Sequence, residues 1–104
     1  MKIGVIGLGV LGKAYVKGFT AWGHKITPYD IKGKFVFEKI LNTEICFICV
    51  PSPSRKNGDC DTRIVESVLK KLNKKKFNGI ICIASTVGIG FTSKSISKFR
   101  NLKI

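Results

Sequence analysis

The stretch KIGVIGLGVLG at residues 2–12 decides the fold of this chain. A short apolar run ends in the pattern Gly-x-Gly-x-x-Gly, and apolar side chains at helical spacing follow it directly. In a strand–turn–helix unit, Gly7 makes the tight turn, Gly9 lets the backbone approach a pyrophosphate, and Gly12 lets the helix pack on the strand. The N–H groups and partial positive charge at the helix start then attract a phosphate. The stretch therefore predicts a dinucleotide site, with an ordinary glycine-containing loop as the alternative.

Asp30 stands where a dinucleotide site needs an acid. It lies 18 residues past Gly12, at the end of a second predicted strand over residues 25–29, and the expected spacing is about 20. A charge-assisted hydrogen bond from a ribose hydroxyl to this carboxylate contributes about 1.5–3 kcal/mol. The same charge repels a 2′-phosphate, so NAD is favoured over NADP, and Lys32 and Lys34 weaken that preference. The alternative for Asp30 is an ordinary strand-end or capping role.

The composition indicates a small, strongly basic protein. The chain has 104 residues, with 19 Lys and Arg against 6 Asp and Glu, for a net charge of +13. This length predicts one domain over residues 1–104. The lysine run at 70–76 would suit nucleic acid, but the aromatic residues do not alternate with lysines and no nucleic-acid motif is present. We interpret that run as a solvated helix end, with weak non-specific anion binding as a side effect.

No apolar run approaches the roughly 20 residues of a membrane span. The residues after the N-terminal apolar stretch lack a small-x-small cleavage site, which argues against a signal peptide. We therefore expect a cytoplasmic protein with no membrane partner and no specific nucleic-acid partner.

Four cysteines occupy positions 46, 49, 60 and 82. Cys46 and Cys49 form a Cys-x-x-Cys inside the apolar run 45–50, which is typical of a strand buried on both faces. Residues three apart on a strand face opposite sides, which spoils both a metal clamp and a redox pair. We therefore expect buried thiols in a reducing compartment, without disulfides or a metal site.

The remaining segments alternate between strands and helices. Further strands are predicted at 25–29, 45–50 and 80–84, with the start of another at 102–104, and helices at 13–22, 62–72 and 91–99. The inner face of the middle helix is predicted to carry Ile64, Val65, Val68, Leu69 and Leu72. Residues 34–37 suggest a brief edge strand, and 38–41 one helical turn. This alternation predicts an α/β fold with a doubly wound parallel sheet of the Rossmann, NAD-binding type. The loops at 7–12, 50–53 and 85–86 should then border one crevice.

Three further motifs resemble a known family. They are Val-Pro-Ser-Pro at 50–53, Asn-Gly-Asp-Cys-Asp at 57–61, and Ala-Ser-Thr-Val at 84–87. Their order and spacing, together with the glycines and Asp30, resemble the N-terminal NAD-binding domain of UDP-glucose/GDP-mannose 6-dehydrogenases. The resemblance covers essentially the whole chain.

The resemblance implies NAD as the cofactor and a set of residues that hold it. Val10 and Leu11 would place backbone near the pyrophosphate, and Asp30 with Lys34 would bind the adenosine ribose. Thr86 would lie beside the nicotinamide and the reacting centre, where it positions water or polarises the sugar oxygen, which makes it the one candidate catalytic residue. The candidate cofactor-binding residues are Gly7, Gly9, Val10, Leu11, Gly12, Asp30, Lys34, Val50, Pro51, Ser52, Ser85 and Thr86.

The family oxidises the C6 alcohol of a nucleotide sugar twice, with NAD as acceptor, through a cysteine thiohemiacetal and thioester. Its catalytic cysteine, lysine and glutamate lie beyond residue 104, and none of the four cysteines here matches the nucleophile. We therefore expect a cofactor domain that is inactive alone and needs a second, nucleotide-sugar-binding domain. The alternatives are the cofactor domain of a hydroxyacid dehydrogenase and a non-enzymatic nucleotide-binding or interaction module. We also expect self-association through a bare sheet edge beside residues 80–84.

Overall fold

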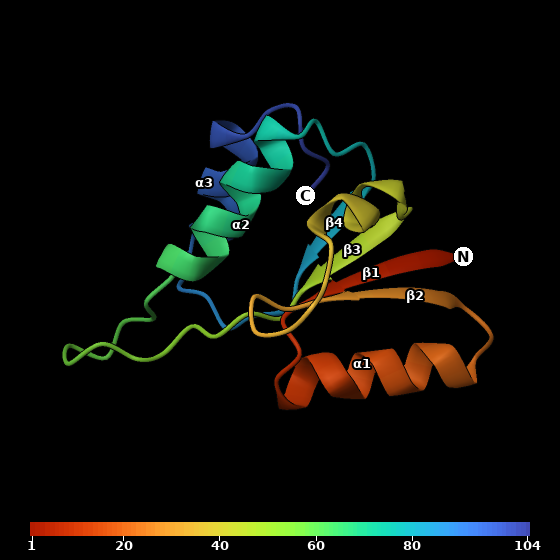
Figure 1. The fold of residues 1–104 in the computed structure, drawn as a ribbon. Coiled ribbons are helices and arrows are strands. Elements are labelled where there is room, and N and C mark those ends of the chain that lie inside the picture. The colour runs from red at the N-terminus through yellow and green to blue at the C-terminus, as the bar shows by residue number, and fades with distance from the viewer.

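A parallel sheet with helices on both faces forms the framework, and the computed structural model describes all residues 1–104. The strands are β1 (Lys2–Ile6), β2 (Lys25–Tyr29), β3 (Ile45–Ile48) and β4 (Ile80–Ile83), in the order β2-β1-β3-β4. The α-helices are α1 (Val10–Ala21), α2 (Arg63–Lys74) and α3 (Phe91–Lys98), and η1 (Phe37–Asn42) is a 3-10 helix. Figure 1 shows α1 on one face of the sheet and α2 with α3 on the other. The predicted doubly wound parallel sheet is confirmed.

The first strand lies at the centre, between the second and the third. Ile3 pairs with Ile26 on one side and with Ile45 on the other, and all pairings are parallel. The chain therefore runs from β1 through α1 to β2 on one side, and then crosses back to form β3 on the other side of β1. The loops that follow β1 and β3 diverge at this point, which is where open α/β sheets bind ligands. The prediction that the first strand lies beside the strand expected at 45–50 is confirmed, and that strand is observed as β3 (Ile45–Ile48).

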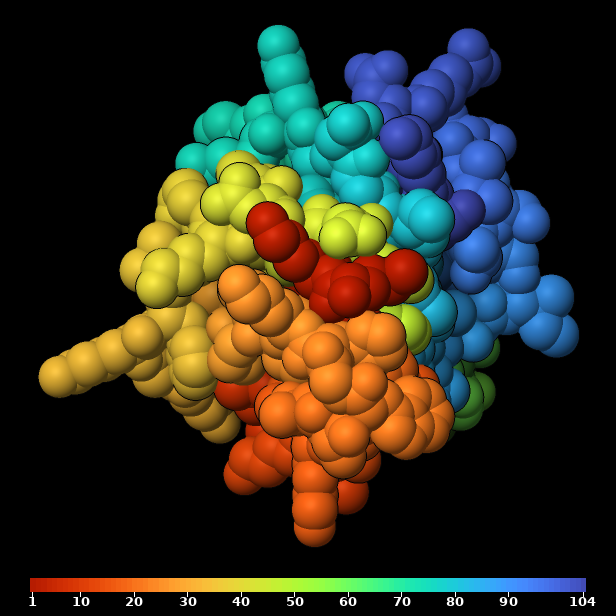
Figure 2. Space-filling view, turned by 90° about the vertical axis from the view of Figure 1, so that its right-hand side faces the viewer, coloured from red at the N-terminus to blue at the C-terminus, as the bar shows by residue number.

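The two faces of the sheet carry cores of different size. On the α1 face, the core has three buried residues, Ile3, Val5 and Cys49. On the α2 face, a larger core combines residues of the sheet, η1, α2 and the C-terminal segment: Ile6, Phe37, Ile40, Cys46, Ile48, Val50, Val65, Leu69, Leu72, Phe77, Ile81, Phe99 and Leu102. Figure 2, seen from the end where the strands begin, shows the red N-terminus between the orange segment that includes β2 and the teal and blue segments of the C-terminal half. The two cysteines of the Cys-x-x-Cys face opposite cores as predicted, and all four thiols are free.

The middle helix packs mostly as its sequence predicts. Val65, Leu69 and Leu72 of α2 are fully buried, as expected for residues that recur on one face of a helix. The prediction was wrong for Ile64, which is 44% exposed. Ile64 lies at the edge of the apolar face, where α2 borders a cleft instead of the sheet.

The segment after β2 differs from its prediction. Residues 34–37 form no strand, and only the predicted helical turn at 38–41 is confirmed, within η1. Phe37 is buried, and its ring meets the ring of Tyr29 edge-on at 5.1 Å between centroids. Burial of Phe37 and Ile40 in the α2-face core draws the chain across the sheet, so it cannot continue along the outer edge of β2.

The last residues return to the sheet beside β4. Lys103 forms a parallel bridge with Ile80, and the N–H of Ile81 donates to the carbonyl oxygen of Lys103 at 2.7 Å. The predicted start of another strand is thus present as one bridge, and self-association through this edge stays a prediction. No helix in the structure combines the length and apolarity that a membrane crossing requires.

Candidate functional site

The turn between β1 and α1 is built so tightly that side chains are excluded. Gly7 has a φ of +97°, and its N–H donates to the carbonyl oxygen of Tyr29 at 2.8 Å. A Cβ on Gly7 would lie 2.7 Å from the carbonyl carbon and oxygen of Cys49. A Cβ on Gly12 would overlap the carbonyl oxygen of Gly7. Gly7 therefore makes the turn, and Gly12 lets the helix pack against it, as the sequence predicts.

Gly9 behaves differently, because a Cβ at this position would meet no atom within 4 Å. Its backbone faces open space at the start of α1. Gly9 is the N-cap residue, no side chain caps the helix, and the first turn holds no acid. The first N–H groups of an α-helix have no partner within the helix. Together with the helix dipole, they leave an exposed site for an anion.

Asp30 is tied to this turn by its own carboxylate. Its Oδ2 accepts a hydrogen bond from the N–H of Leu8 at 2.8 Å, and its Oδ1 accepts one from the N–H of Lys32 at 2.9 Å. These two bonds, first that of Lys32 and then that of Leu8, lower the pKa of Asp30 below its ordinary value. A carboxylate has about four acceptor positions, so each oxygen can still accept a ribose hydroxyl.

The ends of β3 and β4 form the opposite wall. The Ser85 hydroxyl donates toward the carbonyl oxygens of Val50 at 2.8 Å and Ile48 at 3.2 Å. The buried Ser85 side chain thus fixes the end of β3 to the end of β4. Thr86, the next residue, is exposed. The Ser85 side chain is therefore committed to positioning backbone, whereas the Thr86 side chain is free to meet a ligand.

These walls enclose a cleft of about 820 Å³, which falls within the roughly 300–1,000 Å³ usual for ligand sites. Most of the predicted cofactor residues line it: Gly7, Gly9, Val10, Leu11, Asp30, Val50, Pro51, Ser52, Ser85 and Thr86. Gly12 is buried behind the turn. Lys34 is exposed on the loop after β2 and is not among the lining residues, whereas Lys32 is.

One wall was missed by sequence analysis. It is formed by side chains of α2 and the segments that pack against it, namely Tyr29, Ile31, Phe37, Ile64, Ser67, Val68 and Lys71. The ammonium of Lys71 lies 4.2 Å from the ring centroid of Phe37 and 5.7 Å from that of Tyr29. The spacing of 64, 68 and 71 on one helix face was the available signal, but apolar spacing alone does not distinguish a core from a cleft wall.

Cys49 lines the cleft beneath the glycine turn. Burial, with a smaller contribution from Cys82, raises the pKa of its thiol to about 11. Burial raises that of Cys46 to about 12. Since the thiolate is the nucleophilic form, neither residue is an activated nucleophile.

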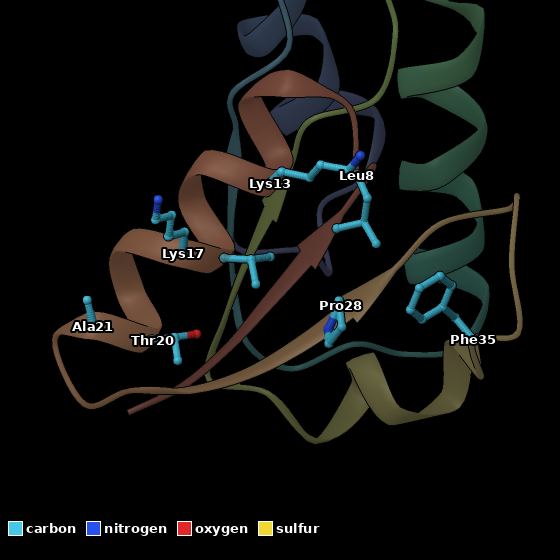
Figure 3. Close-up of a pocket in the computed structure, with 8 residues that line it drawn as sticks. Leu8, Lys13, Lys17, Thr20, Ala21, Pro28 and Phe35 are labelled. Atoms are coloured by element: carbon cyan, nitrogen blue, oxygen red, sulfur yellow. The ribbon is translucent and has the colours of Figure 1, made fainter.

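A second hollow of about 610 Å³ lies between α1 and β2, on the other side of the glycine turn. Figure 3 shows Lys13 extending toward Leu8, with Phe35 on the side away from α1. This second hollow is lined by Leu8, Lys13, Val16, Lys17, Thr20, Ala21, Pro28 and Phe35. None of the predicted cofactor residues is among them, so the cleft at the strand ends is the candidate site.

Solved structures show the same fold in several dehydrogenases. A UDP-D-ManNAc dehydrogenase from Pyrococcus horikoshii aligns with a TM-score of 0.86 and 20% identity, over 100% of this chain and 34% of that one. A UDP-glucose dehydrogenase from Pyrobaculum islandicum aligns with a TM-score of 0.80 and 19% identity, over 98% of this chain and 34% of that one. A GDP-mannose dehydrogenase from Pseudomonas aeruginosa aligns with a TM-score of 0.80 and 24% identity, over 95% of this chain and 31% of that one.

Sequence comparison identifies the family. GDP-mannose 6-dehydrogenase from Pseudomonas aeruginosa is 34% identical over 62 residues, which are 55% of this chain and 14% of that protein. The chain thus spans a small part of the relatives it matches. The family profile described as "UDP-glucose/GDP-mannose dehydrogenase family, NAD binding domain" matches residues 33–103. This chain belongs to that family, as its NAD-binding domain.

Proposed function

We propose that the cleft at the strand ends binds NAD with its pyrophosphate on the glycine turn and its adenosine ribose on Asp30. The convergence of three separate features on one cleft carries this proposal. They are the uncapped start of α1, the carboxylate at the end of β2, and the exposed Thr86 after β4. Each has the chemistry that one part of a dinucleotide requires: N–H donors for the diphosphate, an acceptor for ribose hydroxyls, and a polar side chain near the remaining end.

The residues of the cleft supply binding and orientation. The open backbone at Gly9, followed by Val10 and Leu11, receives the diphosphate. Asp30 is deprotonated at neutral pH and is held in place by the Leu8 and Lys32 N–H groups, so it accepts ribose hydroxyls without having to reorganise. Val50, Pro51 and Ser52 cover one side of the bound dinucleotide.

We propose that the complete enzyme oxidises the primary alcohol of a nucleotide sugar, as the names of the related UDP-glucose and GDP-mannose dehydrogenases suggest. When bound, NAD supplies the hydride acceptor. In this proposal, Thr86, which is exposed and lines the cleft, orients the reacting oxygen or a water near the nicotinamide. The only acid lining the cleft is Asp30, which is tied to backbone, and the only thiol is that of Cys49, which is protonated. A catalytic base and nucleophile would then come from a second, substrate-binding domain.

Titration of the 104-residue chain with NADH tests the binding proposal directly. We expect enhanced nicotinamide fluorescence that saturates below millimolar concentration and is reversed by NAD. Because the chain carries a charge of +13, any polyanion will show some attraction to it. Tripolyphosphate at equal ionic strength is therefore the matched control, and it should not displace NADH. No fluorescence change at millimolar NADH, or equal displacement by tripolyphosphate, would refute the proposed site.

A further inference from the structure

Charged groups are unevenly distributed at the adenosine end of the cleft. Of the residues that line the cleft, only three carry charge at neutral pH: Asp30, Lys32 and Lys71. Two ammonium groups therefore share the cleft with one carboxylate. They come from different elements, because Lys32 follows β2 whereas Lys71 projects from α2.

The ammonium of Lys71 has no acidic partner. Two other lysines of the α2 and α3 helix surface do: Lys75 pairs with Glu38 at 3.2 Å, and Lys98 pairs with Glu66. No carboxylate lies within 4 Å of the Lys71 ammonium. It lies instead over the rings of Phe37 and Tyr29. Glu38, which pairs with Lys75, is still near enough for the charge of Lys71 to contribute to its lowered pKa. Since Tyr29 immediately precedes Asp30, the Lys71 ammonium is a cation without a direct acidic partner beside the end of β2.

Lys32 brings the second cation to the same place. Its N–H donates to Asp30, it is among the residues that line the cleft, and its ammonium is in no ion pair. Both oxygens of Asp30 already accept backbone hydrogen bonds. The repulsion that Asp30 would exert on a phosphate is therefore reduced by its own partners and by two free ammonium groups.

We propose that the cleft also accepts the 2′-phosphorylated dinucleotide NADP, with Lys32 and Lys71 binding the 2′-phosphate. The inference rests on the proposed dinucleotide site. A cation near the ribose is the feature by which dinucleotide-binding folds accommodate a 2′-phosphate. Here the cations are supplied by the loop after β2 and by α2, on two sides of the residue that favours NAD.

The test compares NADH and NADPH affinities by fluorescence titration of the chain and four variants. We expect NADPH to bind the wild type within about tenfold of NADH. Lys71→Met and Lys32→Met should each weaken NADPH binding by about fivefold and change NADH binding by less than twofold, because a single surface-accessible charge contact is lost. Lys71→Arg keeps the charge and should retain NADPH binding. Lys70→Met, on the same helix but outside the cleft, is the matched control and should change neither affinity.

Methionine keeps the apolar stem over Phe37, so the charge is tested separately from packing. An equal loss of NADH and NADPH binding in Lys71→Met would overturn the inference. So would NADPH that fails to bind at concentrations where NADH saturates the wild type. Failure of NADH itself to bind would refute the proposed function, and the inference with it.

Discussion

The two ends of the cleft differ in whether backbone or side chains face the ligand. At the end formed by the glycine turn, the ligand-facing surface is backbone, and a Cβ at Gly7 or Gly12 would collide with other backbone atoms. At the end formed by α2, the surface consists of side chains, among them Phe37, Ile64 and Lys71. The first end has one conformation that only certain residues permit. At the second end, exposed residues such as Ile64 and Lys71 can change without disturbing the fold, whereas Phe37 belongs to the core.

This difference predicts that mutations at the two ends act on different properties. Changes at the glycine turn should alter folding and binding together, because the turn is part of the sheet–helix packing. Changes at the exposed residues of the α2 end, such as Lys71, should alter ligand preference with little effect on the free energy of unfolding. The following experiments test that separation.

The largest effect is expected for Gly12→Ala. The added methyl would overlap the carbonyl oxygen of Gly7, so α1 must move away from the turn. We expect a loss of about 3 kcal/mol in the free energy of unfolding, measured by urea denaturation, and no detectable NADH binding. Gly18→Ala in the same helix is the matched control, since its Cβ meets nothing within 4 Å. It should stabilise the chain by about 0.5–1 kcal/mol. Equal stability of the two variants would contradict the account of the turn.

The alkylation rate of the Cys49 thiol measures how readily the glycine turn opens to solvent. Its pKa is raised to about 11 by burial, so at pH 8 only about one thiol in a thousand is ionised. Alkylation of Cys49 by iodoacetamide at pH 8 should be at least about twentyfold slower than alkylation of free cysteine. Peptide mapping by mass spectrometry follows each site. The half-exposed Cys60 serves as the internal comparison and should be labelled first. Rapid labelling of Cys49 would show that the turn opens readily.

Asp30 lies between the glycine turn and the α2 wall, so Asp30→Asn tests a residue that belongs to both ends of the cleft. Loss of the charge should weaken NADH binding about tenfold or more and improve NADPH binding relative to NADH. Asp59→Asn, on the exposed loop before α2, should leave both affinities unchanged. An unaltered ratio of the two affinities would remove Asp30 from the ribose site.

The pH dependence follows from the same carboxylate. The pKa of Asp30 in the folded chain lies below its ordinary value, so the charge is complete at pH 5 as well as at pH 7. NAD affinity measured by calorimetry should therefore be equal at these two values. The stabilising contribution of Asp30 is present above the unfolded pKa of about 4 and is lost as pH falls through the lower, folded pKa.

Among these substitutions at the site, the smallest effect is expected for Ser85→Ala. Its hydroxyl bonds to the Val50 and Ile48 carbonyls hold the ends of β3 and β4 together. Removing a buried hydroxyl should lower the free energy of unfolding by about 1 kcal/mol and weaken NADH binding only a few-fold. Ser54→Ala, on the exposed part of the loop after β3, should change neither quantity. A tenfold loss of binding would instead indicate direct contact between Ser85 and the ligand.

The same difference explains which parts of the site the sequence could predict. Gly7, Gly9, Gly12 and Asp30 could be placed because backbone geometry restricts both residue type and spacing. The buried strands could be placed because unbroken apolar runs such as 45–48 leave few alternatives.

The α2 wall could not be predicted from local patterns. Ile64 continues the apolar spacing of the core, and nothing in the sequence shows that the sheet ends before reaching it. The sequence also gives no means to tell that Lys32 and not Lys34 lines the cleft, because the loop after β2 has no periodicity to orient its side chains. Residues 34–37 have the composition of a strand, yet the contact between Phe37 and Tyr29 draws them away from the outer edge of β2.

Pro28 has a consequence for how this sheet can be extended. The N–H of Lys25 donates to the carbonyl oxygen of Met1, and the carbonyl oxygen of Tyr29 accepts from the N–H of Gly7. Both residues thus face β1, so Pro28, which alternates with them, turns its nitrogen to the outer side of β2. A proline nitrogen cannot donate, which leaves a gap in any new ladder on that side. At the opposite margin, β4 already pairs with Lys103. A further strand is therefore disfavoured beside β2, whereas the β4 margin already accepts one.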